Sequence, residues 1–231
     1  KPITFGLFRC RDLAVAMVAV LEPLRAVPLW LSVMMLGSMA APHCLYAYIW
    51  DNPEDFKLRS RTMPLRLLGE HAVAVMEKLV LGLKAIQLST VLAWFEYGLL
   101  PACGFAAAQG RWAVADALRS AAPARWILGL GLLIPGQALN LGIYKAIGAD
   151  GVYYGAKLGR PVPWASGFPF NLGLRHPQYV GAMLSWAGIF SLLAATPSTA
   201  APLGAVLFGW TGLYCASATL EASSDADTQG K

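Results

Sequence analysis

One stretch of the chain, residues 167–181, concentrates side chains that a membrane helix normally excludes. It reads GFPFNLGLRHPQYVG. Four polar residues crowd the start of the apolar helix that follows: Arg175, His176, Gln178 and Tyr179. Pro177 takes the first helical position, where proline is favoured. Side chains of these types suit proton transfer and the binding of charged groups. We therefore take this loop as the candidate active site, although each residue alone would also suit a polar cap.

The composition indicates a membrane protein. Of the 231 residues, 57% are hydrophobic and only 13% are charged, whereas a soluble domain carries about a quarter charged residues. The apolar residues come in blocks and do not alternate, which argues against a transmembrane barrel. The sequence therefore predicts an all-α, polytopic integral membrane protein that forms a single domain over residues 1–231.

About five transmembrane helices are predicted, and the last two form a helical hairpin. The apolar blocks cover residues 26–50, 72–100, 126–147, 177–195 and 203–220. Residues 1–25 contain an apolar run too short to cross about 30 Å of hydrocarbon, so an interfacial segment is expected there. The chain begins at Lys1 without an initiator methionine, and we expect it to be processed or trimmed.

Two polar features of the helices bear on function. The hairpin returns the chain to its starting side, so Glu221 should emerge at the same membrane face as His176. In the third helix, Gln137, Asn140 and Tyr144 follow one face at i, i+3 and i+7. Such a stripe serves either helix–helix hydrogen bonding or a ligand pocket. Lys84 lies inside the second helix, near enough to its end to extend to the surface.

Charge and cysteine usage exclude several other classes. The net charge is +5, and the basic residues lie mainly between apolar blocks, as in loops at anionic lipid surfaces. No basic patch interleaved with aromatic residues suggests nucleic acid. The four cysteines are scattered, without a CxxC pair or zinc-like spacing. The expected partner is the lipid bilayer, with no metal and no nucleic acid.

The connection before the candidate loop is rich in glycine. Gly148 and Gly155 are two of its four glycines, and the same connection contains Tyr153, Tyr154, Lys157, Arg160 and Trp164. Glycine lets a ligand approach the backbone closely. The spacing matches neither a P-loop nor a dinucleotide-binding fingerprint.

Four pieces in order resemble the membrane phospholipid N-methyltransferases of the phosphatidyl-N-methylethanolamine N-methyltransferase type. They are GQALN at 136–140, GADGVYYGAKLGRPVPW at 148–164, the 167–181 loop, and LEAS at 220–223. The chain is also similar to the wider superfamily of isoprenylcysteine carboxyl methyltransferases, which share an RHP-x-Y-x-G loop and a hairpin ending in glutamate. The resemblance covers residues 136–221, the expected catalytic core.

The resemblance implies S-adenosylmethionine as methyl donor, bound in a pocket closed by the loop and the hairpin end. The residues implied for that pocket are Arg175, His176, Pro177, Tyr179, Gly181, Gly148, Gly155, Gln137 and Glu221. Arg175 and the free N–H groups of the helix start would hold the donor's carboxylate. Relatives often end the hairpin with two adjacent glutamates, whereas Ala222 follows Glu221 here.

The implied reaction needs a base, because an ethanolamine amine must lose its proton before it attacks the donor methyl. Glu221 and His176 are the two candidates, and the sequence does not rank them. Lys157 and Arg160 are candidates for binding the lipid phosphate. Tyr154 and Trp164, with Tyr153 and Tyr179, could face the cationic groups by cation–π contact.

The expected function is donor-dependent N-methylation of phosphatidyl-N-methylethanolamine, and of its dimethyl form, toward phosphatidylcholine. Two alternatives stay open: carboxyl O-methylation of isoprenylcysteine, and a non-catalytic role as a transporter or assembly subunit. Donor supply favours a cytosol-facing site in the endoplasmic reticulum, with a plastid membrane as the other location.

Overall fold

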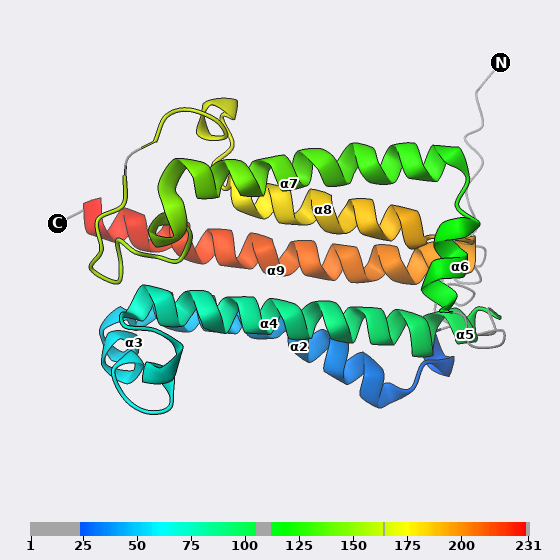
Figure 1. Cartoon of the computed structure of the whole chain (residues 1–231), viewed down its shortest axis with the longest axis horizontal. Coiled ribbons are helices and arrows are strands. Elements are labelled where there is room, and N and C mark those ends of the chain that lie inside the picture. Colours follow the sequence, from blue (N-terminus) through cyan, green and yellow to red (C-terminus); the bar gives the residue numbers. More distant parts are fainter. Residues whose placement is uncertain (1–23, 105–111, 164, 230–231) are drawn as a thin grey trace, which may run out of the picture.

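The computed structural model describes residues 24–104, 112–163 and 165–229, which form helices and no strand. Five helices run side by side along the long axis of the molecule (Figure 1). They are α2 (Leu29–Asp51), α4 (Ala72–Trp94), α7 (Pro123–Val152), α8 (Pro177–Leu193) and α9 (Pro197–Gln229). Shorter helices lie at the ends: α3 (Pro53–Ser60), α5 (Leu100–Ala102) and α6 (Ala113–Arg119). The predicted all-α class is confirmed.

The predicted number of membrane spans is close to what the structure shows. Four segments of the described chain are long and apolar enough to cross a bilayer: Leu29–Asp51, Ala72–Ala102, Pro123–Val152 and Pro197–Ala222. The remaining predicted span, 177–195, corresponds to α8, which has 17 residues and is therefore about 25 Å long. The expected interfacial segment lies almost wholly in residues 1–23, outside the described part of the chain.

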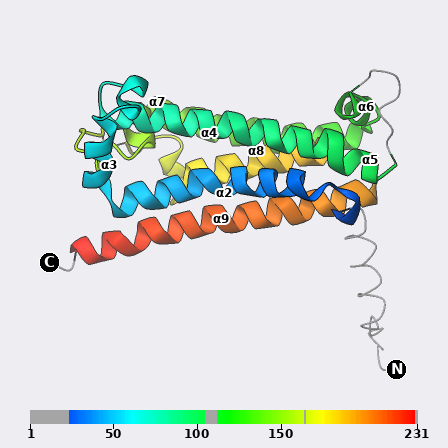
Figure 2. The same cartoon turned by 90° about the horizontal axis from the view of Figure 1, so that it is seen from below.

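The α8–α9 hairpin is fixed by its turn. Pro197 opens α9 at a position where its missing N–H is no loss. Thr196 and Thr199 cap the helix reciprocally, because each hydroxyl accepts the other residue's backbone N–H, at 3.3 and 3.0 Å. The tight turn therefore sends α9 back along α8, and its C-terminal part returns to the end where α8 begins (Figure 2).

Helices α7 and α8 approach closely along a seam of glycines. A Cβ atom added at Gly136 would lie 2.7 Å from the Gly181 carbonyl oxygen, and one at Gly188 would lie 2.6 Å from the Gly129 carbonyl oxygen. In each helix the two glycines are seven residues apart, so they lie on the same face of that helix. Because α7 and α8 are antiparallel, the two glycine faces meet along the contact. The seam fixes how far α8 reaches toward the candidate site.

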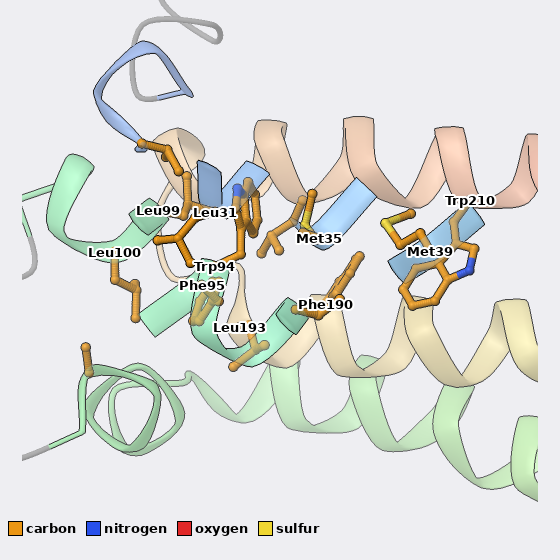
Figure 3. Close-up of a cluster of buried hydrophobic side chains, with 14 of the residues drawn as sticks. Leu31, Met35, Met39, Trp94, Phe95, Leu99, Leu100, Phe190, Leu193 and Trp210 are labelled. Atoms are coloured by element: carbon orange, nitrogen blue, oxygen red, sulfur yellow. The ribbon is translucent and has the colours of Figure 1, made fainter. Parts of the chain in front are cut away.

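The apolar core forms two clusters, one around Ile49, Phe56 and Met76 near the candidate site and a larger one toward the other end of the bundle. Figure 3 shows Trp94 and Phe95 of the α4 region among side chains from α2, α8 and α9. The ring centroids of Trp210 and Trp186 lie 4.2 Å apart. A buried carboxylate, Glu96, accepts the N–H groups of Ala113 and Val114 at 2.6 and 2.8 Å. Glu96 therefore caps α6, the structural role that its position at a helix end suggests.

The glycine seam generates a stability prediction. Gly136→Ala should lower the free energy of unfolding by about 1–3 kcal/mol, because its methyl group overlaps α8 backbone. Gly131→Ala is the matched control on the same helix, since a Cβ there meets nothing within 4 Å. The measurement is thermal unfolding of both variants in one detergent. Equal melting temperatures for the two variants would show that Gly136 does not contact the α8 backbone closely.

Candidate active site

A polar pocket lies between the end of α2, the end of α7, the start of α8 and the C-terminal part of α9. Its volume is about 220 Å³. We call it the outer pocket, and its main polar and aromatic lining comprises Tyr46, Trp50, Tyr154, Arg175, His176, Tyr179 and Glu221. These residues come from α2, α8, α9 and the connection, so segments far apart in the sequence contribute to one site.

The Glu221 carboxylate is the centre of this pocket. Its Oε1 atom accepts hydrogen bonds from the hydroxyl of Tyr154, at 2.6 Å, and from that of Tyr179. Its Oε2 atom lies 3.4 Å from Nδ1 of His176. The structure thus brings Glu221 and His176 together, as the hairpin predicts. The carboxylate side chain is 13% exposed and the imidazole 26%, so the imidazole lies nearer to solvent.

Tyr154 adopts an unusual backbone conformation. Its φ of 56° falls in the left-handed region, which is rare for a bulky residue. Residues in such conformations gather at functional sites, where surrounding contacts hold them. Burial, and then the negative charge of neighbouring groups including Glu221, raises the pKa of Tyr154. The hydroxyl therefore stays protonated near neutral pH and donates to the carboxylate.

The start of α8 presents a positive and open face to the pocket. His176 precedes Pro177, no side chain in the described part of the chain caps the helix, and Arg175 lines the cavity beside them. The imidazole stacks on the Tyr179 ring, with centroids 5.5 Å apart and planes 10° apart. A helix N-terminus and a guanidinium together favour an anionic group.

Aromatic side chains of α2 close the other wall of the outer pocket. The Trp50 ring packs edge-on against Tyr154, with centroids 5.1 Å apart. The Lys157 ammonium lies 4.0 Å from the centre of the Trp50 ring, a cation–π contact. Sequence reasoning missed Tyr46 and Trp50 as pocket residues. Their i, i+4 spacing puts them on one helix face, but only the fold shows which ligand site that face meets.

Several predicted site residues lie outside the outer pocket. Gln137 donates to Ser185 Oγ at 2.8 Å, which favours helix–helix bonding over ligand binding for this residue, and Gly181 packs against α7. Gly155 lies in a turn, where its N–H bonds the Asp150 carbonyl at 2.7 Å. Trp164 lies outside the described residues.

A neighbouring surface groove contains two further predicted residues. Gly148 kinks α7 there, with a φ of 66°, a conformation that suits glycine. Arg160 forms an ion pair with Asp150 at 2.9 Å. Its guanidinium is therefore already partnered, on the outer surface and away from Glu221.

The fold and the pocket define an integral membrane protein with a polar site at one membrane face, closed by a helical hairpin. Residues 124–221 match the phospholipid methyltransferase family, so the resemblance found in the sequence is confirmed over α7, α8 and α9 as far as Glu221. A stretch of 54 residues is 44% identical to phosphatidyl-N-methylethanolamine N-methyltransferase of Arabidopsis thaliana. That stretch covers 23% of this chain and 32% of the relative. No solved structure matches the chain.

The hydrogen bond from Tyr154 to Glu221 generates a second prediction. Tyr154→Phe keeps the ring but removes the donor, and should lower the free energy of unfolding by about 1.5–3 kcal/mol, as expected for a bond to a charged group. Tyr97→Phe is the control, because Tyr97 is 67% exposed. Thermal unfolding in detergent measures both. If Tyr154→Phe melted like the wild type, the Tyr154 hydroxyl would not support the carboxylate.

Proposed function

We propose that this protein methylates the amine of a membrane phospholipid, with S-adenosylmethionine as the methyl donor. The acceptors are phosphatidyl-N-methylethanolamine and its dimethyl form, on the way to phosphatidylcholine. The single observation that carries the proposal is the Glu221 carboxylate, held by two tyrosine hydroxyls beside His176. It lies at the end of the region that matches the phospholipid methyltransferase family.

The outer pocket has the chemistry that this donor requires. S-adenosylmethionine supplies an electrophilic methyl group on a sulfonium, and it also carries an α-carboxylate. Arg175 and the uncapped start of α8 provide positive partners for that carboxylate. The rings of Tyr46, Trp50 and Tyr179 provide aromatic faces for a cation, at about 0.5–2 kcal/mol each.

Glu221 is the residue we assign as general base. A protonated acceptor amine gives its proton to the carboxylate, and the freed nitrogen lone pair then forms the new N–C bond. The bond between methyl carbon and sulfur breaks, and its electron pair stays on sulfur. His176 contacts the same carboxylate and is more exposed, so it can pass the proton on to solvent. His176 thereby keeps Glu221 ready for the next cycle.

The comparison with known proteins favours an amine acceptor over the carboxyl group of isoprenylcysteine. Both kinds of enzyme share the loop and the terminal glutamate, but the 54-residue stretch with 44% identity belongs to phosphatidyl-N-methylethanolamine N-methyltransferase. The proposed site faces the cytosol from the endoplasmic reticulum, or the stroma in a plastid, because the donor is water-soluble and reaches the pocket from that side.

The test is methyl transfer by the purified protein in detergent, with labelled donor and phosphatidyl-N-methylethanolamine. Wild type should transfer label to the lipid. Glu221→Gln keeps the side-chain shape and one carbonyl oxygen for the two tyrosine hydroxyls but loses the base, so the rate constant should fall about 100-fold or more. Glu70→Gln, an exposed carboxylate at the same end, should retain the wild-type rate. A folded wild type without transfer, or full activity in Glu221→Gln, would overturn the proposal.

A further inference from the structure

A second cavity lies beside the outer pocket, toward the middle of the bundle. Its volume is about 170 Å³, and it shares the side chains of Tyr46, Gln178 and Tyr179 with the outer pocket. We call it the inner chamber. Its remaining polar lining consists of Lys84, Asn140, Tyr144, Tyr153 and Tyr214. Neither the resemblance nor the chemistry of Glu221 accounts for this chamber.

The inner chamber lies deeper in the membrane than Glu221. Tyr214 and Glu221 are seven residues apart on α9, which puts them on one face and about 10 Å apart along the axis. Tyr214 lines the chamber, whereas Glu221 lines the outer pocket. A molecule that extends from one cavity to the other would therefore lie along the membrane normal, past Tyr46 and Tyr179.

Lys84 is the charged residue of the chamber. It lies twelve residues after Ala72 on α4, about 18 Å along the helix. Among the described residues, no ion pair or hydrogen bond is recorded for its ammonium. An ionisable side chain at membrane depth is expensive and usually faces a partner or a wet cavity. Snorkelling was the sequence-based interpretation, but the structure places Lys84 on the chamber wall.

Two neutral polar side chains accompany Lys84. Asn140 of α7 and Gln178 of α8 both line the chamber, and both carry amide N–H donors. Together with the ammonium they converge from three helices on one space. An ammonium and two amides are a donor set suited to an anion such as a phosphate diester.

The tyrosine rings of the chamber favour a cation, whereas Lys84 and the two amides favour an anion. Tyr179 and Tyr214 lie 5.3 Å apart between ring centroids, and Tyr46 completes the boundary with the outer pocket. Aromatic faces attract alkylated ammonium groups. The chamber thus has anion-binding groups at Lys84, and cation-binding rings on the side toward Glu221.

We propose that the inner chamber binds the zwitterionic headgroup of the acceptor phospholipid, with its phosphate on Lys84 and its amine at Tyr46 and Tyr179. This inference rests on the proposed function. The order of groups matches a lipid in a bilayer, whose phosphate lies deeper than its amine. The amine then points to Glu221 and the outer pocket. Leu81 of α4 and Tyr144 of α7 line the chamber and are 46% and 39% exposed, so in this arrangement the acyl chains would leave the chamber past these two side chains and stay in the membrane.

The first test is binding, without turnover. The protein is purified in a maltoside detergent and titrated with dodecylphosphocholine, or with dodecyltrimethylammonium, which lacks the phosphate. Lys84→Met should weaken dodecylphosphocholine binding about tenfold, the size expected for loss of a charged hydrogen bond. Binding of dodecyltrimethylammonium should not change. Lys84→Arg should keep most of the affinity, and Lys78→Met, an exposed lysine of the same helix, should bind like the wild type.

The second test is kinetic and separates this inference from the proposed function. Lys84→Met should raise the KM for the lipid acceptor about tenfold, while donor affinity stays at the wild-type value. If wild type methylates lipid but Lys84→Met changes neither KM nor dodecylphosphocholine binding, the headgroup site is refuted and Lys84 only snorkels. If wild type binds dodecylphosphocholine through Lys84 but transfers no methyl group, the proposed function fails and the headgroup site stands. Should Lys84→Met not fold, Asn140→Ala replaces it, with the same expected selectivity for the phosphate compound.

Discussion

A carboxylate at the end of an apolar helix has to be stabilised by hydrogen-bond donors, and in this protein the donors come from elsewhere in the chain. Glu221 ends the apolar part of α9, Tyr179 belongs to α8, and Tyr154 to the connection after α7. The same carboxylate contacts His176 at the start of α8. The Glu221 carboxylate therefore connects α8, α9 and the segment after α7 through hydrogen bonds. The outer pocket forms where these three segments meet.

Two features of the packing make this meeting point reproducible. The reciprocal threonine cap and Pro197 set the turn between α8 and α9. The glycine seam then fixes α8 against α7. Because close backbone contacts allow little sliding, the start of α8 and the end of α9 keep their relative height. A one-turn shift of either helix would separate His176 from Glu221 by about 5 Å.

Much of this arrangement could be predicted from the sequence. Blocks of apolar residues predict the helices, and a hairpin of two similar helices predicts that His176 and Glu221 share a membrane face. The sequence could not predict which helices lie side by side, or which of their faces meet. A polar stripe on α7 does not reveal that Gln137 meets Ser185 while Asn140 faces a cavity. Likewise, the sequence predicts Trp50 as an interfacial aromatic residue, whereas the structure shows that it packs against Tyr154. The sequence predicts that Lys84 extends to the surface, whereas the structure places it on the wall of the inner chamber.

In the proposed arrangement, the water-soluble donor occupies the outer pocket and the lipid headgroup occupies the inner chamber, with Tyr46, Gln178 and Tyr179 between them. Both proposals depend on the position of the donor. The most direct measurement is photolabelling of the detergent-solubilised protein with an azido-adenosyl analogue of S-adenosylmethionine, followed by peptide mapping. We expect label within residues 46–50, 143–154 or 170–179, and its loss when unlabelled donor is added in excess. Label confined to the opposite end of the bundle, or label that unlabelled donor does not displace, would contradict a donor site in the outer pocket.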